Sequence, residues 1–245
     1  MRACILTIGD ELLSGLRENA NACFLGRALA DEGVDVVGQA TVGDRSDAIR
    51  TALLHWIGRV ELLILTGGLG ATPDDQTRPS VARALGLRRV LHEPSAARIL
   101  ERKRPMAGAR DGVESPALIP LGAEALENPL GLAPGFTLVH GGTLLVALPG
   151  VARELEAMWE RYRTELITAR LPVSQRWIWR TLETCGLSES DVAARVAPRL
   201  PAGVRAAYLP RPGCVAVRLG LRGGSEPAAE ELLARAVDAV AAELG

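Results

Sequence analysis

Residues 66–77 read Thr-Gly-Gly-Leu-Gly-Ala-Thr-Pro-Asp-Asp-Gln-Thr and combine three closely spaced glycines with two adjacent carboxylates. The apolar run at residues 61–65 predicts a buried strand before this segment, and residues 78–85 predict a helix after it. Glycines at a strand-to-helix crossing let backbone amides approach a phosphate, and acids beside them can hold a metal ion or a hydroxyl group. The segment therefore predicts a site for a phosphorylated ligand. The alternative is a plain turn in which Asp74 or Asp75 caps the helix.

Two other predicted strand ends carry similar residues. Residues 3–8 predict a strand that ends in Gly9-Asp10-Glu11, with Ser14 and Asn21 close behind, and residues 34–42 predict a strand that ends in Gly43-Asp44. Ligands of an open parallel sheet bind beyond the carboxyl ends of its strands. The three strand ends are therefore expected to build one pocket.

Acids gathered at one edge of a sheet repel each other unless a metal, protonation or a polar ligand stabilises them. Oxygen ligands without His or Cys favour Mg²⁺ or a similar hard cation, which can polarise a pyrophosphate and activate a water molecule. The predicted metal ligands are Asp10, Asp44 and Asp75, and the predicted catalytic residues are Asp44, Asp74 and Asp75. The alternative is that these acids only cap helices and form turns.

The order of predicted elements favours an α/β fold whose mostly parallel sheet is covered by helices on both faces. Helices at 21–32 and 46–59 alternate with the three strands; Ser46 or Asp47 is expected to cap the second helix, and the helix at 78–85 ends at Gly86. The elements predicted next are a strand at 87–91, a helix at 94–104, a loop at 106–115, a Pro/Gly-rich loop at 128–135, a hairpin of 136–140 and 143–148, and a helix at 151–170 with Val151 on its apolar face.

The remainder of the chain predicts a second, small α+β domain. Leu171-Pro172 is typical of a linker, and the elements after it follow the order β-α-β-β-α. We expect the first domain at residues 1–170 and the small domain at residues 175–245. The elements predicted for the small domain are strands at 177–184, 204–209 and 214–221, a helix at 189–200 capped by Ser188, and a helix at 226–244.

Composition argues against several classes of protein. The net charge is −1 and aromatic residues make up 3% of the chain, so we expect neither a nucleic-acid partner nor a membrane partner. We expect neither a Gly-x-x-Gly clamp nor a basic-aromatic face on the small domain. No segment is apolar for long enough to cross a bilayer, and the chain begins without a basic leader, so a cytoplasmic protein is expected.

The four cysteines and three histidines are dispersed along the sequence. A zinc site or a disulfide framework is not expected, and Cys4 and Cys23 are predicted to lie in the core. A Walker A loop, a dinucleotide G-x-G-x-x-G and a G-x-S-x-G elbow are all absent from the sequence. His140 is expected at the exposed tip of the hairpin.

Together these motifs resemble those of CinA-type competence/damage-inducible proteins. The resemblance is carried by Ile8-Gly9-Asp10-Glu11-Leu12-Leu13-Ser14-Gly15, Val42-Gly43-Asp44, the whole segment 66–77, Asn128-Pro129-Leu130-Gly131-Leu132-Ala133-Pro134-Gly135-Phe136 and Leu148-Pro149-Gly150. It implies a Rossmann-like three-layer domain of the MoaB/Mog molybdopterin-binding fold, followed by the small domain of CinA proteins. It also implies that the separate C-terminal amide-hydrolysing domain is missing, so nicotinamide mononucleotide deamidation is not expected.

The resemblance implies two activities for the same pocket. CinA relatives are associated with metal-dependent cleavage of ADP-ribose to AMP and ribose 5-phosphate, whereas Mog and MoaB relatives bind and adenylylate molybdopterin. The essential acids of the Mog-type pocket match Asp44 and Asp75. Two segments depart from the CinA pattern. Val151-Ala152 stands where CinA relatives usually have the two prolines of Leu-Pro-Gly-Pro-Pro-x-Glu, and residues 112–117 replace a common Asn-Arg-Lys-Gln-Ala segment.

The leading hypothesis is therefore a hydrolase that cleaves the pyrophosphate of a nucleoside diphosphate sugar such as ADP-ribose, with Mg²⁺ or Co²⁺. The alternatives are molybdopterin binding and adenylylation, and a non-catalytic nucleotide-binding protein, which the altered rim favours. Since relatives associate, a homo-oligomer is expected. The residues predicted to bind the nucleotide or pterin are Gly9, Asp10, Glu11, Ser14, Asn21, Gly43, Thr66, Gly67, Gly68, Leu69, Gly70, Thr72, Thr77, Pro149 and Gly150.

Overall fold

The computed structural model describes residues 1–103, 114–168, 177–223 and 227–245. Contacts divide the chain into two compact units, which we describe one by one. The first unit comprises residues 1–28 and 35–164, and the second comprises residues 29–34 and 165–245. The boundary expected at residues 170–175 lies outside the described residues.

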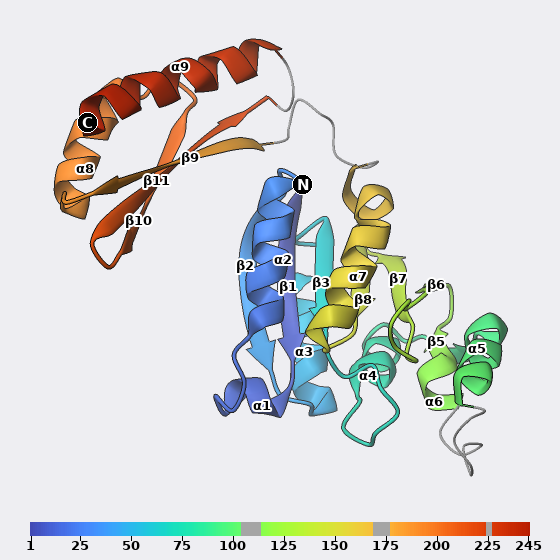
Figure 1. Cartoon of the computed structure of the whole chain (residues 1–245). Helices are drawn as coiled ribbons and strands as arrows, with labels where there is room; N and C mark the ends of the chain where they lie inside the picture. Colours follow the sequence, from blue (N-terminus) through green and yellow to red (C-terminus); the bar gives the residue numbers. More distant parts are fainter. Residues whose placement is uncertain (104–113, 169–176, 224–226) are drawn as a thin grey trace. The chain divides into compact units, whose positions relative to one another are not determined.

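A six-stranded sheet forms the centre of the first unit (Figure 1). Four parallel strands come first in the order β2-β1-β3-β8, and the antiparallel strands β7 and β6 complete the sheet. All five residues of β3 are buried, as expected for a continuous apolar run in a sheet that is covered on both faces. The strands are β1 (Arg2–Ile8), β2 (Asp35–Val42), β3 (Leu62–Thr66), β6 (Glu124–Leu126), β7 (Gly135–His140) and β8 (Thr143–Leu148).

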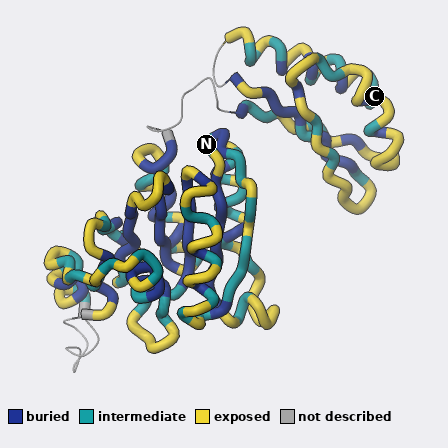
Figure 2. The backbone as a smooth tube through the Cα atoms, turned by 180° about the vertical axis from the view of Figure 1, so that it is seen from behind, coloured by how far each residue is buried: buried dark blue, intermediate teal, exposed yellow. Residues whose placement is uncertain are grey.

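Helices cover both faces of this sheet. Helices α2 (Ala20–Asp31) and α7 (Ala152–Arg163) lie on one face, and α3 (Ser46–Trp56) and α4 (Thr77–Ala84) lie on the other (Figure 1). The core between α3, α4 and the sheet contains Leu53 and Val81 together with strand residues such as Leu6. Figure 2 shows buried central strands with exposed segments around them. This is the α/β three-layer arrangement that the alternation of elements predicts.

Short elements complete the first unit. Helix α1 (Asp10–Leu13) directly follows β1, and β4 (Arg89–Leu91) pairs antiparallel with β5 (Leu118–Pro120) in a separate two-stranded sheet. Helices α5 (Glu93–Lys103) and α6 (Glu114–Ala117) lie next to this small sheet, and a π-helical turn, η1 (Thr164–Thr168), follows α7.

The second unit is a three-stranded antiparallel sheet with helices on one face. The strand order is β10-β11-β9, formed by β9 (Trp177–Cys185), β10 (Arg205–Arg211) and β11 (Cys214–Arg222). Helices α8 (Glu189–Val196) and α9 (Pro227–Leu244) pack on one face of this sheet, and the 3-10 helix η3 (Ala197–Arg199) follows α8. Ser188 caps α8 as predicted, because its hydroxyl accepts a hydrogen bond from the amide of Asp191 at 3.1 Å.

Several local predictions were wrong. The helix expected over 151–170 begins at Ala152 and passes at Thr164 into the π-helical turn η1, and residues 169–170 lie outside the described residues; Val151 precedes the helix and is 57% exposed, so it does not belong to its apolar face. Ser46 does not cap α3, since its hydroxyl instead accepts hydrogen bonds from Ser80 and Arg83 of α4. Cys4 is buried as predicted, whereas Cys23 is exposed, on the solvent side of α2.

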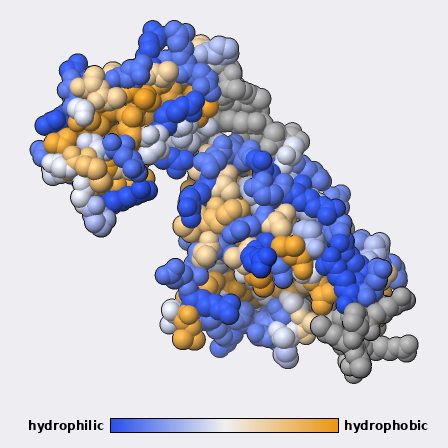
Figure 3. All heavy atoms as spheres, viewed as in Figure 1, coloured by the Kyte–Doolittle hydropathy of each residue, from blue (hydrophilic) through white to orange (hydrophobic). Residues whose placement is uncertain are grey.

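The sequence patterns missed the short elements α1, α6, β5 and β6. The loop predicted at 106–115 lies outside the described residues up to position 113, and Ser115 belongs to α6. His140 is exposed beside the hairpin turn, as expected. In the described part of the chain, no helix is long and apolar enough to cross a membrane. Hydrophilic residues cover much of the face drawn in Figure 3.

Candidate functional site

A cavity of about 680 Å³ lies at the edge of the sheet where β1, β2, β3 and β8 end. The cavity brings together all three strand ends that the sequence singles out. Arg17 is the only positively charged residue among the described residues that line it. The lining residues predicted from sequence are Gly9, Glu11, Asp44, Gly67, Gly68, Leu69, Gly70, Asp74, Asp75, Pro149 and Gly150.

The remaining predicted residues do not line this cavity. Asn21 and Thr66 line a smaller neighbouring cavity of about 210 Å³. The others support the surrounding loops or lie beside them; these are Asp10, Ser14, Gly43, Thr72 and Thr77.

The glycine-rich loop between β3 and α4 requires glycine at two positions. Gly67 and Gly68 have φ angles of 104° and 61°, in the left-handed region. A Cβ atom on Gly67 would lie 2.2 Å from the carbonyl oxygen of Ile8, and one on Gly68 would lie 2.5 Å from Oγ1 of Thr77. The Thr77 hydroxyl donates to the Gly67 carbonyl at 2.7 Å. Thr77 therefore fixes the loop against the start of α4.

Asp75 holds the same loop from the other side. Its carboxylate accepts hydrogen bonds from the amide of Gly70 at 2.7 Å, the amide of Thr72 at 2.8 Å and the hydroxyl of Thr72 at 2.5 Å. It does not cap α4, whose N-cap residue is Gln76. The Gly70 amide is thus already bonded. Within Gly67–Gly70, for which the described residues give all the partners considered, the amides of Gly68 and Leu69 have no hydrogen-bond partner and can donate to a ligand.

Asp10 and Asp44 join the first two strand ends through reciprocal hydrogen bonds. The amide of Asp10 donates to Asp44 Oδ2 at 3.0 Å, and the amide of Asp44 donates to Asp10 Oδ1 at 3.2 Å. Burial raises the pKa of Asp44, and the negative charges of Asp10, Glu11 and Asp74 raise it further. Asp74 differs, because the neighbouring Thr72 side chain lowers the pKa of its exposed carboxyl group.

The chemistry of these side chains suits a hard cation, since all of them offer carboxylate oxygens. Within the described residues, however, no group of three or more His, Cys, Asp or Glu side chains is placed to hold a metal ion. Asp75 also has both oxygens bonded to its own loop. A divalent cation would therefore need oxygens of the ligand as well as those of the protein. The metal site stays a prediction.

The opposite wall of the site is built by the β8–α7 connection. Thr66 donates its hydroxyl to the carbonyl oxygen of Pro149 at 2.9 Å, and Asn21 donates to Thr66 Oγ1 at 3.0 Å and to the carbonyl oxygen of Gly150 at 2.8 Å. These bonds connect α2, β3 and the β8–α7 connection. Asn21 and Thr66 therefore act as braces behind the cavity.

Sequence reasoning missed Arg78, which is 2% exposed in α4. Its guanidinium group donates to the carbonyl oxygens of Leu69 and Pro134, and so joins the glycine-rich loop to the 128–135 loop. Burial lowers the pKa of Arg78 to about 10. Within the described part of the chain, its Nε has no hydrogen-bond partner. No sequence signal distinguishes this arginine from the others in the chain.

Asn128 and Glu154 were also missed. Asn128 accepts hydrogen bonds from the amides of Leu130 at 3.1 Å and Gly131 at 2.8 Å, and it donates to Glu154 Oε2 at 2.7 Å. Glu154 of α7 lines the cavity. The Pro/Gly-rich loop is thus held in one conformation, and its glycine and proline signals could have pointed to the polar residues that anchor it.

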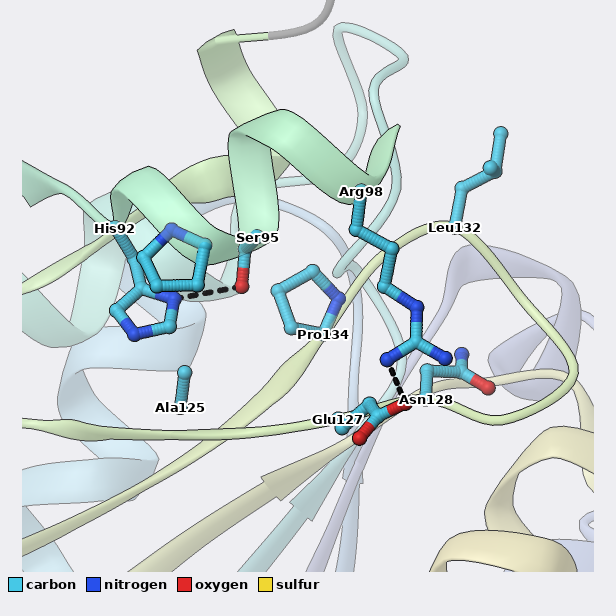
Figure 4. A pocket seen from close by; sticks show the side chains of 9 residues that line it. His92, Ser95, Arg98, Ala125, Glu127, Asn128, Leu132 and Pro134 are labelled. Atoms are coloured by element: carbon cyan, nitrogen blue, oxygen red, sulfur yellow. Dashed lines mark hydrogen bonds and ion pairs between the residues drawn. The ribbon is translucent and has the colours of Figure 1, made fainter. Parts of the chain in front are cut away.

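A second cavity of the first unit, of about 200 Å³, has a different character (Figure 4). His92 and Ser95 share a hydrogen bond of 2.7 Å between Nδ1 and Oγ. Arg98 pairs with Glu127, which also accepts from Arg161 at 2.8 Å. The His92–Ser95 and Arg98–Glu127 pairs satisfy their own polar groups, which indicates structural roles for these side chains.

Comparisons with known proteins agree with this geometry. The family described as "Probable molybdopterin binding domain" matches residues 4–169, and the family described as "Damage-inducible protein CinA KH domain" matches residues 179–245. A solved structure of CinA from Thermoplasma acidophilum, a protein of unknown function, is 33% identical with a TM-score of 0.64; the match covers 68% of this chain and 98% of that one.

CinA-like proteins from Chlorobaculum tepidum and Geobacter metallireducens are each 35% identical over the whole of this chain. The chain spans only 59% and 60% of their lengths. The first unit thus has the MoaB/Mog-type molybdopterin-binding fold, as the sequence predicts. The chain belongs to the CinA-like family and combines that domain with the CinA KH domain.

Proposed function

We propose that the first unit hydrolyses the pyrophosphate bond of a nucleoside diphosphate sugar such as ADP-ribose, with the help of a divalent cation. The observation that supports this most is one cavity that combines unbonded loop amides with five acids. The amides belong to Gly68 and Leu69, and the acids are Glu11, Asp44, Asp74, Asp75 and Glu154. The volume of this cavity, about 680 Å³, lies within the usual range for sites of small ligands.

The side chains divide into anion-binding and acidic groups. The amides of Gly68 and Leu69 and the guanidinium group of Arg17 would bind phosphate oxygens. Asp44 would accept the proton of the attacking water molecule, as a carboxylate within reach of that water can do. A bound Mg²⁺ or Co²⁺, held by Asp44 with Asp10 or Asp74, would supply charge neutralisation on the phosphates.

Turnover is tested by incubating the full chain with ADP-ribose and either Mg²⁺ or Co²⁺ and measuring AMP and ribose 5-phosphate. Asp44→Asn is expected to lower the rate at least about 100-fold, because it removes the acceptor of the proton. Asp47→Asn is the matched control, since Asp47 is exposed, pairs with Arg45 and does not line the cavity. A rate for Asp44→Asn equal to that of the parent would refute the assignment of the base.

A second function deserves a test because the matching family is described as a molybdopterin-binding domain. The same amides and acids would then hold the phosphate of a pterin and an adenylyl group. The chain is titrated with ADP-ribose and, separately, with a phosphorylated pterin, and its melting temperature is measured at each concentration. The ligand that raises the melting temperature at the lower concentration is the tighter one. Stabilisation by ADP-ribose without release of AMP over hours would favour the third, non-catalytic alternative.

A further inference from the structure

The sheet of the second unit has one face covered by α8 and α9 and one open face. Side chains alternate between the two faces along each strand. Residues such as Val217 and Leu219 pack against the helices, so the alternate positions of the strands point to the open face. Register places Arg211 of β10, Cys214 of β11 and Cys185 of β9 in one row across that open face.

The open face also carries aromatic and basic side chains. The rings of Trp177 and Trp179 stack with centroids 5.2 Å apart. The guanidinium groups of Arg205 and Arg218 lie 5.0 Å and 4.6 Å from the ring centroids of Trp177 and Trp179, at cation–π distance. The sequence-based expectation that this unit lacks a basic-aromatic face was therefore wrong, because only strand register brings these residues together.

The backbone around the two cysteines has the geometry that a disulfide needs. The amide of Gly186 donates to the carbonyl oxygen of Gly213 at 3.3 Å, so these two glycines form a hydrogen-bonded pair. Since the two kinds of pair alternate along an antiparallel ladder, Cys185 and Cys214 form a non-hydrogen-bonded pair. Such pairs have Cα atoms about 4.5 Å apart, and disulfides span Cα distances of about 4.4 to 6.8 Å. The two cysteines can therefore be joined without moving the strands.

The pair is also accessible. Both cysteines carry free thiols; Cys185 is exposed and Cys214 is half-buried. Gly186 and Gly213, their neighbours at the ends of the strands, place no side chain over the thiols, and a Cβ atom at either glycine would meet nothing within 4 Å. A small reagent can therefore reach Cys185.

The surroundings give the two thiols different roles. Contact with the Cys185 side chain raises the pKa of the Cys214 thiol, burial raises it further, and the positive charge of Arg211 opposes both. Arg211 is itself paired with Glu183 at 2.9 Å. Thiol–disulfide exchange depends on the thiolate fraction and on access. The more exposed Cys185 is therefore the thiol that reacts first, and Cys214 is the one that closes the bond.

We propose that Cys185 and Cys214 form a reversible disulfide that joins β9 to β11 under oxidising conditions. With a small disulfide such as glutathione disulfide, the Cys185 sulfur attacks one sulfur of the reagent and releases one glutathione. The Cys214 sulfur then attacks the Cys185 sulfur of the mixed disulfide and releases the second glutathione. The protein gives up two electrons and two protons, and the two released thiols take them up.

The disulfide closes a loop over residues 186–213, which contains α8, η3 and β10. A cross-link of this kind restricts the unfolded chain, so it stabilises the folded second unit. An exposed disulfide is also readily reduced, which makes the change reversible. This redox response is independent of the reaction proposed for the first unit.

The test uses the reduced full chain, incubated without oxygen in buffers with different ratios of reduced to oxidised glutathione. The exchange is stopped with acid, free thiols are blocked with N-ethylmaleimide, and tryptic peptides are analysed by mass spectrometry. Peptides 181–195 and 206–218, which contain the two cysteines, are expected as a linked pair in oxidising buffer and as two blocked peptides in reducing buffer. The melting temperature of the second unit is expected to rise by about 5 °C or more on oxidation and to return with dithiothreitol.

Cys214→Ser is expected to abolish the linked pair and to leave a lasting glutathione adduct on Cys185. Cys23→Ser is the matched control, because Cys23 is an exposed cysteine of α2 in the first unit, and its loss should leave the link unchanged. Absence of the linked pair in fully oxidising buffer, a bond from Cys185 or Cys214 to a second chain on a non-reducing gel, or a link without a rise in melting temperature would each overturn the proposal.

Discussion

The two units present charge in opposite ways. The first gathers carboxylates from three loops at the edge of a sheet and encloses them in a cavity. The second displays arginines on the open face of a sheet, where strand alternation alone brings them together. The net charge of −1 conceals both arrangements. A chain with a net charge of −1 can thus carry an acidic cavity in one unit and a basic sheet face in the other.

The difference also concerns how each site depends on the fold. Loops that form a cavity need internal bonds, and Arg78, Asp75 and Thr77 supply them in the first unit. A sheet face needs no such support, because its backbone is already bonded in the ladder. Substitutions around the cavity should therefore disturb folding and binding together, whereas those of exposed arginines on the open sheet face of the second unit should disturb folding little.

The largest effect is expected for Arg78→Met. This change leaves the carbonyl oxygens of Leu69 and Pro134 without a donor in a buried position, and it removes a group that is 2% exposed. Loss of two hydrogen bonds from a charged donor should lower the free energy of unfolding by about 3 kcal/mol. Urea denaturation of the full chain measures this difference in the free energy of unfolding between the variant and the parent.

Arg83→Met in the same helix is the control for Arg78→Met, since Arg83 is exposed and donates only to Ser46. Arg83→Met should lower the free energy of unfolding by about 0.5 kcal/mol. If both variants lost the same stability, the joining of the two loops by Arg78 would not be a significant source of stability, and the contrast between the units would weaken.

A pair of glycines separates strain from crowding in the first unit. Gly68 and Gly86 have similar φ angles of 61° and 66°, but a Cβ atom would meet Thr77 Oγ1 at 2.5 Å in the first case and nothing within 4 Å in the second. Gly86→Ala should cost about 1 kcal/mol from backbone strain alone. Gly68→Ala should cost about 2 kcal/mol and should also weaken ADP-ribose binding. Equal losses in thermal unfolding would show that the loop relieves the contact with Thr77 and that only backbone strain remains.

The sequence predicts the strand ends of the first unit well, because parallel strands carry their carboxyl ends to the same edge. Asp44 and the Gly67–Gly70 loop were identified in this way and line one cavity. Arg78 was missed because its burial depends on two loops that lie far apart in the sequence. Cys185 and Cys214 directly face each other in the β9–β11 ladder, which their spacing alone does not reveal. Patterns along the chain report local structure, whereas register and loop contacts are set by the whole fold.

Asp44→Asn should change stability less than Arg78→Met and Gly68→Ala do, and it should raise stability where they lower it. Folding raises the pKa of Asp44 above its ordinary value of 3.8, so the folded state holds the proton more tightly than the unfolded chain. The stability that results is present below about pH 3.8 and is lost as the pH rises through the raised pKa. The asparagine variant should therefore melt at a higher temperature than the parent at pH 7, and the difference should shrink towards pH 4.

Asp47→Asn provides the opposite case. A hydrogen bond and ion pair with Arg45 lower the pKa of Asp47, so its carboxylate favours folding at neutral pH. Its replacement should lower the melting temperature slightly at pH 7. Two variants that shift the melting temperature in the same direction would contradict the assigned crowding of charge around Asp44.

The smallest effect on stability is expected in the second unit. Arg205→Glu removes one cation–π contact with Trp177 from an exposed side chain and leaves the helix-covered core untouched. Such contacts at exposed sites contribute about 0.5 kcal/mol, so the free energy of unfolding should fall by about that amount. A loss of about 2 kcal/mol or more would show that the arginines stabilise the sheet itself, and the contrast between a supported cavity and an independent surface would no longer hold.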